Sequence, residues 1–208
     1  MNRFCLIALA TLGLCSSAGA VTTWNFSSSP DHSLGVTSFA YTVGGVTITA
    51  SGFYNNNTGR ILYDKFTTSV TNDESGLGFT DDAFGNHEID TSGFIVLNLS
   101  NSFFNGKSLA LTITSIQAGE SYQWYHGSST GAGATQGLSL VASTLTSSPL
   151  TFMGGGSNSF IAIEATSHNV LLNSLTATAT PEPRFYGLLL AGLLGLAGIV
   201  YRKRHVTE

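Results

Sequence analysis

Six carboxylates lie close together near the middle of the chain, between Thr71 and Asp90: Asp73, Glu74, Asp81, Asp82, Glu88 and Asp90. Clustered carboxylate oxygens in a flexible loop suit Ca²⁺, a hard cation that takes roughly six to eight oxygen ligands. The spacing does not match the EF-hand loop, because the glycine and the terminal glutamate stand at other positions. The segment therefore predicts either a calcium site or a solvated acidic loop. Calcium is the one cofactor that the sequence suggests.

General acid–base chemistry would need a histidine close to a carboxylate. His87 lies beside Glu88 and near Asp82, and Glu120 comes shortly before His126. Such neighbours arise easily by chance, and the histidines have no metal-ligand spacing. The sequence therefore predicts a protein that is not an enzyme and has no catalytic residues.

Aromatic side chains offer one further chemistry, the stacking of sugar rings. The candidates are Trp24, Tyr122, Trp124 and Tyr125. Residues of this kind are also ordinary core residues of a β-sandwich, which is the interpretation that the sequence favours.

Composition indicates the class of domain that must position these residues. The central section is rich in Gly, Ser, Thr and β-branched residues and poor in helix formers. It contains only three basic residues, Arg60, Lys65 and Lys107, against eleven acids from Asp31 to Glu182. A surface of that sign repels phosphate backbones, so the sequence argues against nucleic-acid binding. Both cysteines, Cys5 and Cys15, lie in the N-terminal apolar run.

Apolar runs separated by turn residues predict an all-β domain, a β-sandwich of jelly-roll type, over residues 21–178. The expected strands are 36–43, 46–53, 61–66, 94–99, 109–116, 122–126, 138–141, 160–164 and 170–177. Gly44-Gly45 predicts a tight hairpin turn. The alternation of Leu109, Leu111 and Ile113 with smaller residues predicts one buried face for that strand.

The N-terminus has the three parts of a secretory signal peptide over residues 1–20. Arg3 precedes an apolar stretch, which is followed by small residues. Ala18 and Ala20 match the small-x-small rule of signal peptidase, so we expect cleavage before Val21.

The C-terminus predicts a transmembrane helix. Residues 185–201 are seventeen uncharged residues, which would span about 25 Å as a helix. The basic tail Arg202-Lys203-Arg204 follows at once and should stay cytoplasmic. This orientation places the β domain outside the cytoplasm.

Pro181-Glu182-Pro183 stands directly before that helix, and Arg202 directly after it. This order, on a chain with a signal peptide, resembles the PEP-CTERM sorting signal over residues 179–204. The resemblance implies that the partner is an exosortase, a membrane-embedded cysteine protease-transpeptidase, which recognises the triplet and processes the chain near it. The two prolines would keep the triplet extended and accessible at the membrane face.

The sequence thus predicts an exported bacterial cell-surface or extracellular-matrix protein, sorted by an exosortase and associated with exopolysaccharide. Its precursor would be anchored in the inner membrane with the ectodomain outside, and its product would lie at the cell surface or beyond. The alternative is a secreted carbohydrate-binding or hydrolytic domain that uses the same sorting route. A membrane protein that stays anchored without processing shares every feature except cleavage.

Overall fold

The computed structural model describes residues 20–28, 30–66, 74–128, 137–179 and 192–196. One compact unit covers Ala20–Ala179, and the chain ends belong to a second unit. Of the predicted signal peptide only Ala20 is described, and of the predicted sorting segment only residue 179 and the helical residues 192–196. Within these described residues, no helix reaches the length and apolar character that a membrane crossing requires.

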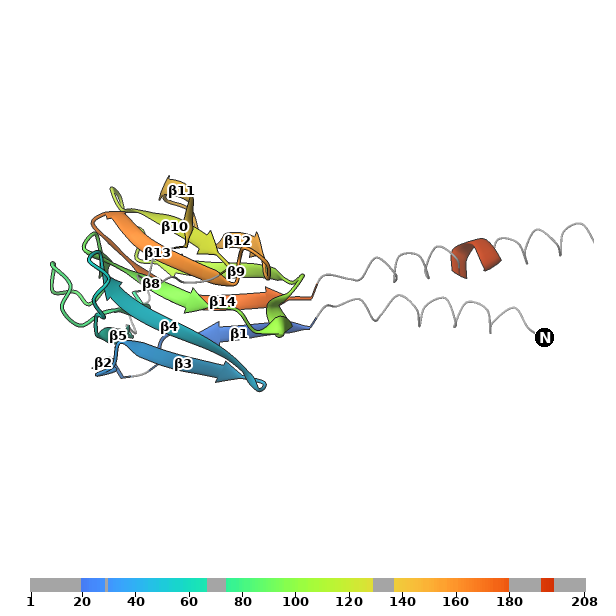
Figure 1. Ribbon diagram of the computed structural model, residues 1–208, viewed down its shortest axis with the longest axis horizontal. Coiled ribbons are helices and arrows are strands. Elements are labelled where there is room, and N and C mark those ends of the chain that lie inside the picture. Colours follow the sequence, from blue (N-terminus) through green and yellow to red (C-terminus); the bar gives the residue numbers. More distant parts are fainter. Residues whose placement is uncertain (1–19, 29, 67–73, 129–136, 180–191, 197–208) are drawn as a thin grey trace, which may run out of the picture. The chain divides into compact units, whose positions relative to one another are not determined.

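The central unit consists of two antiparallel sheets, which confirms the all-β prediction (Figure 1). Sheet A has the order β12-β9-β14-β6-β5-β2, and β1 and β7 also pair with β14. Its strands are β1 (Val21–Asn25), β2 (His32–Ser33), β5 (Leu62–Lys65), β6 (Gly76–Phe79), β7 (Ile89–Asp90), β9 (Ser108–Thr114), β12 (Leu150–Met153) and β14 (Asn169–Thr178).

Sheet B has the order β11-β10-β13-β8-β4-β3. Its strands are β3 (Ser38–Val43), β4 (Val46–Tyr54), β8 (Gly93–Asn98), β10 (Ser121–Gly127), β11 (Ser139–Leu145) and β13 (Phe160–Ser167). A short 3-10 helix, η1 (Ser102–Phe104), follows β8. All nine strands expected from the sequence are present within a few residues of their predicted bounds.

Local sequence explains the turns and the faces of these strands. Gly44 and Gly45 join β3 to β4 with φ of 58° and 79°, the left-handed conformation that a two-residue hairpin requires. In β9 the residues Leu109, Leu111 and Ile113 are buried and alternate with half-buried neighbours, as the period of two predicts.

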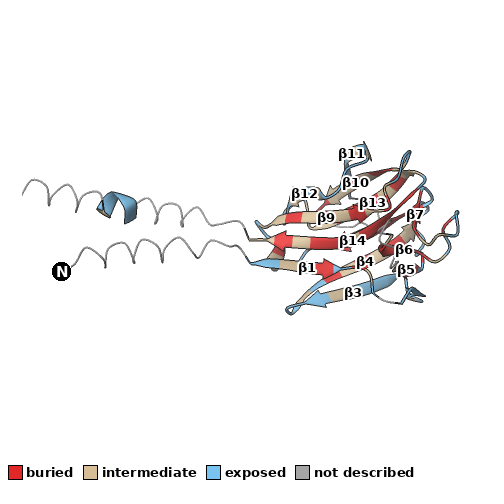
Figure 2. Cartoon of the chain, turned by 180° about the vertical axis from the view of Figure 1, so that it is seen from behind, coloured by how far each residue is buried: buried red, intermediate tan, exposed pale blue. Residues whose placement is uncertain are grey.

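The core lies between the sheets and draws on both of them. Sheet A contributes Trp24 and Leu175, and sheet B contributes Ile48, Leu97 and Ile163, all completely buried. The indole N–H of Trp24 donates to the carbonyl of Val46 at 3.0 Å, so β1 and β4 are also joined by a hydrogen bond. Figure 2 shows the buried residues along β14 and β9.

Strand β14 is the most heavily paired element. Along one edge it pairs with β9 from Leu171 to Thr178. Along the other edge it pairs in turn with β7, β6 and β1. The last of these pairings joins Val21 to Thr178, and the N–H of Ala179 donates to the carbonyl of Ala20 at 3.3 Å. The two ends of the domain therefore lie side by side.

Candidate functional site

The acidic segment does not form a flexible loop throughout, so that part of the sequence interpretation is wrong. Residues Gly76–Phe79 form β6, and all four are buried. A Cβ on Gly78 would lie 2.2 Å from the carbonyl oxygen of His87 and 2.7 Å from Cα of Glu88. Residues 87 and 88 therefore cross directly over β6, and only glycine allows this approach.

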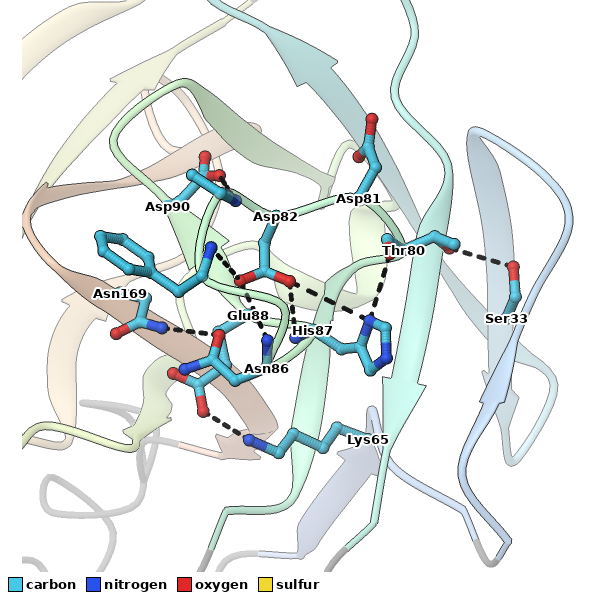
Figure 3. A network of polar contacts seen from close by, with 12 residues as sticks. Ser33, Lys65, Thr80, Asp81, Asp82, Asn86, His87, Glu88, Asp90 and Asn169 are labelled. Atoms are coloured by element: carbon cyan, nitrogen blue, oxygen red, sulfur yellow. Dashed lines mark hydrogen bonds and ion pairs between the residues drawn. The ribbon is translucent and has the colours of Figure 1, made fainter.

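Asp82 closes the loop between β6 and β7. Its side chain is completely buried. Its carboxylate accepts the backbone N–H groups of Phe84 at 3.1 Å, Asn86 at 3.3 Å and His87 at 2.7 Å (Figure 3). A carboxylate with several backbone donors stabilises the local backbone as a helix cap does. Asp82 thus holds the loop that crosses Gly78.

Asp90 binds a buried arginine from the neighbouring β4–β5 connection. The Nη1 of Arg60 lies 2.7 Å from Oδ1 of Asp90, and Nη2 lies 3.0 Å from Oδ2. Both side chains are 1 % exposed. Asp90 also accepts the backbone N–H groups of Ala83 and Ser92. The two parallel bonds between Arg60 and Asp90 form the strongest hydrogen-bond geometry available to an arginine and a carboxylate.

The remaining donors of Arg60 are also satisfied. Its Nε donates to Asp81 at 2.8 Å, and Nη2 donates to the Asp81 carbonyl at 3.0 Å. Its guanidinium carbon lies 4.1 Å from the ring centre of Phe79 and 4.9 Å from that of Tyr54, whose hydroxyl donates to Asp81. Burial alone would raise the pKa of Asp90, but the hydrogen bonds from Arg60 and Ser92 hold that pKa below its ordinary value.

Glu88 belongs to a second buried ion pair. The Nζ of Lys65 lies 2.6 Å from Oε1 of Glu88 and 3.0 Å from Oε2 of Glu74. The hydroxyl of Ser115 also contacts both Glu88 oxygens at 3.1 Å. Burial raises the pKa of Glu88, against the effect of the Lys65 bond. Ser115 has a φ of 57°, an unusual conformation for a residue other than glycine.

The structure distributes the predicted calcium ligands over three separate partners. Asp82 binds backbone N–H groups, Asp81 and Asp90 bind Arg60, and Glu74 and Glu88 bind Lys65. Asp73 lies outside the described residues. Within the part of the chain that is described, no group of three or more acidic, histidine or cysteine side chains is placed to hold a metal ion. Calcium binding here would have to displace Lys65 and Arg60 from buried carboxylates.

Of the acid–base pairings considered from the sequence, His87 and Asp82 lie within ion-pair distance (Figure 3), but their side chains are too far apart for a hydrogen bond. The Nδ1 of His87 lies 4.0 Å from Asp82 and 3.2 Å from the Thr80 carbonyl, and its ring stacks on Tyr63. The Nδ1 of His126 contacts Asn158 at 2.5 Å. Glu120 instead accepts the backbone N–H of Gln117.

The four aromatic candidates do not form a platform. Trp24, Tyr122 and Trp124 are core residues, as the sequence favoured. Tyr125 alone lies half-buried on the opposite face of sheet B, where Phe53 and Phe160 also lie.

Sequence reasoning missed the roles of Arg60 and Lys65. A signal was nevertheless present, because the central section has only three basic residues among many acids. A buried carboxylate needs a cation or several N–H donors, and so few cations leave little choice of partner. The third basic residue, Lys107, lies over the ring of Phe103 at 4.4 Å.

Comparison with known proteins gives no relative from which a role could be transferred. No family model, curated protein or solved structure matches this chain.

Proposed function

We propose that this chain is an exported bacterial cell-surface or extracellular-matrix protein, sorted by an exosortase through Pro181-Glu182-Pro183 and associated with exopolysaccharide. Its precursor would be held in the inner membrane by a helix over residues 185–201, with Arg202 and the rest of the basic tail on the cytoplasmic side.

The observation that supports the proposal is the position in the sequence of both expected processing sites, directly outside the two-sheet domain. The expected signal-peptidase site follows Ala20, which lies beside Ala179 through the pairing of β1 with β14. The triplet begins at Pro181, just after that pairing ends. Cleavage at both sites would therefore leave both sheets and the core intact.

We also infer that the domain is a jelly roll. In that fold eight strands form two four-stranded sheets connected by two Greek keys. The strand orders β6-β14-β9-β12 and β8-β13-β10-β11 support the inference, because the chain alternates between the sheets except at the β10–β11 hairpin. Strands β1 to β5 and β7 extend this arrangement.

We propose that the domain has no catalytic activity. Support comes from the acidic segment, whose described carboxylates bind cations and N–H groups of the domain itself. The purified chain should release no reducing sugar from polysaccharides, as measured by a reducing-end assay. Turnover that is lost in a His87→Ala variant would contradict the proposal.

The decisive test of sorting is the intact mass of the protein from cells with and without an active exosortase. We expect a chain that begins at Val21 and ends near Pro181 to Pro183 only where the exosortase is active. Replacement of Pro181, Glu182 and Pro183 by alanine should abolish this processing, and the matched Thr180→Ala change should not. A mass that retains the apolar segment and the basic tail in both strains would leave a permanently anchored protein.

A further inference from the structure

One face of sheet B carries half-buried aromatic rings and points away from the core. Ile95, Ile161 and Trp124 lie in the core between the sheets. Their neighbours in sequence point to the other side, because alternate residues of a strand face opposite ways. Phe94, Val96 and Ala162 form a separate, buried apolar cluster there, against which Phe53, Tyr125, Leu138 and Phe160 pack. We call this surface the aromatic face.

The strand register arranges these side chains in rows across the sheet. Phe53 lies opposite Phe94, Phe94 opposite Glu164, and Glu164 opposite Gln123. In the next row, Tyr125 lies opposite Ala162. Phe53 and Tyr125 are thus separated by three strand spacings across the sheet, roughly 14 Å, and by one further row along the strands. This distance suits an extended chain of several units better than one small molecule.

Polar groups with fixed positions border the rings. The hydroxyl of Tyr125 donates to Oε2 of Glu164 at 2.9 Å. The side-chain amide of Gln123 donates to the same oxygen at 2.8 Å and to the Tyr125 hydroxyl at 2.8 Å. Burial and then the bond to Glu164 raise the pKa of Tyr125 to about 12, so the hydroxyl keeps its proton at neutral pH. Three strand residues therefore present an ordered amide, hydroxyl and carboxylate.

Charge narrows the class of ligand. Among all residues of β3, β4, β8, β10, β11 and β13, Glu164 is the single aspartate, glutamate, lysine or arginine. A nucleic acid or another polyanion would find no cation on this face and would meet a carboxylate. The surface is complementary to an uncharged ligand that combines apolar faces with hydroxyl groups.

We propose that the aromatic face binds a neutral polysaccharide. The C–H face of a sugar ring stacks on Phe53, Tyr125 or Phe160, and its hydroxyl groups bond with Gln123 and Glu164. The inference rests on the proposed function only for the source of the ligand, the exopolysaccharide outside the cell. The binding chemistry itself follows from sheet B.

The test is affinity electrophoresis of the full-length chain, purified in mild detergent, through gels that contain a polysaccharide. Hydroxyethylcellulose and dextran serve as neutral probes, and alginate serves as the anionic probe. We expect at least one neutral polysaccharide to retard the protein and alginate to leave its mobility unchanged. Retardation by alginate alone, or by none of the three, would overturn the proposal.

Variants locate the binding surface. Tyr125→Ala and Phe160→Ala should each weaken retardation by about tenfold, since an aromatic contact contributes on that order. Phe84→Ala is the matched control, because Phe84 is 58 % exposed on the loop held by Asp82. Equal retardation of all three variants would place binding elsewhere and refute the proposal.

A second kind of variant adds a large side chain to the aromatic face and leaves every aromatic ring in place. Ser51 lies opposite Val96 on the aromatic face and is half-buried. Ser51→Arg should block the face by its size and abolish retardation while the thermal unfolding transition is preserved. Unchanged retardation of a folded Ser51→Arg chain would also refute the proposal. Because the assay uses purified protein, its result is independent of whether an exosortase processes the chain.

Discussion

The buried ion pairs Arg60–Asp90 and Lys65–Glu88, which we call the charged seam, place their polar groups differently from the aromatic face of sheet B. In the seam, cations and carboxylates are buried and bind one another. On the aromatic face, a single carboxylate borders half-buried rings. In the charged seam, hydrogen bonds between buried side chains stabilise the fold. The aromatic face instead keeps apolar surface and ordered polar groups near solvent. The comparison suggests that the residues most suggestive of chemistry stabilise the domain, and that the plainer sheet is the better candidate for binding.

The largest expected effect comes from breaking the seam at Arg60. Arg60→Met leaves the Asp90 carboxylate buried without its cation, which should lower the free energy of unfolding by about 3–5 kcal/mol. Urea denaturation of the purified chain measures this loss. The matched change Lys107→Met removes a cation from a half-buried site over Phe103 and should cost under about 1 kcal/mol. Similar losses in the two variants would show that the buried Arg60–Asp90 pair contributes no more to stability than a half-buried lysine.

Lys65→Met should cost less than Arg60→Met, about 2–3 kcal/mol at neutral pH. The reason is that burial already raises the pKa of Glu88, so this side chain can take up a proton when its cation is removed. The loss should therefore be larger at pH 8 than at pH 5, which urea denaturation at both pH values would reveal. A loss that is the same at both values would mean that Glu88 stays charged.

Protonation of Asp90 should lower the free energy of unfolding at acidic pH. Its pKa is lower in the folded chain than in the unfolded chain, so the unfolded chain binds a proton first as the pH falls. The contribution of Asp90 is complete above about pH 4 and is lost progressively as the pH falls below that value. Thermal unfolding from pH 7 to pH 2.5 should show this decline.

Two variants test whether the loss of stability at acidic pH arises at Asp90. Asp90→Asn should flatten the acid limb of the stability curve, since it removes the titrating group. Glu164→Gln on the aromatic face should leave the Asp90 contribution in place. An acid limb that is unchanged in Asp90→Asn would assign the decline to other carboxylates.

The smallest effect on stability is expected on the aromatic face. Tyr125→Phe removes one hydroxyl and its bond to half-buried Glu164 but keeps the ring, so the free energy of unfolding should change by less than about 1 kcal/mol. Urea denaturation measures this value. A loss comparable to that of Lys65→Met would mean that the face serves the fold in the same way as the seam.

The sequence predicted the strands well because their signals are local. The alternation in β9 and the Gly44-Gly45 turn each depend on a few adjacent residues. The acidic segment was misinterpreted because its structure depends on distant partners. Whether Asp90 is solvated or buried depends on Arg60, which is thirty residues earlier in the chain. Gly76-Leu77-Gly78-Phe79 is also too short an apolar run to show that another backbone crosses it.

The aromatic face could not be predicted from local sequence either, because its residues come from strands far apart in the chain. The apolar run from residue 94 to residue 99 predicted a strand, which is confirmed, and Phe94-Ile95-Val96-Leu97 within it are all buried. The residues that lie beside Phe94 and Val96 depend on the order β10-β13-β8-β4, which joins segments from distant parts of the chain. Tyr125 and Phe160 were therefore visible in the sequence as aromatic residues but not as neighbours.

The pairing of β14 on both of its edges has a mechanical consequence for the membrane-anchored precursor that we propose. A pull transmitted through Ala179 acts along β14, which is hydrogen-bonded to β9 on one side and to β1 at the same end on the other. Such a load acts along the β14–β9 and β14–β1 ladders. The hydrogen bonds of both ladders must therefore break together rather than one after another. In the proposed precursor, the strand next to the anchor would thus be well placed to resist a load on the domain.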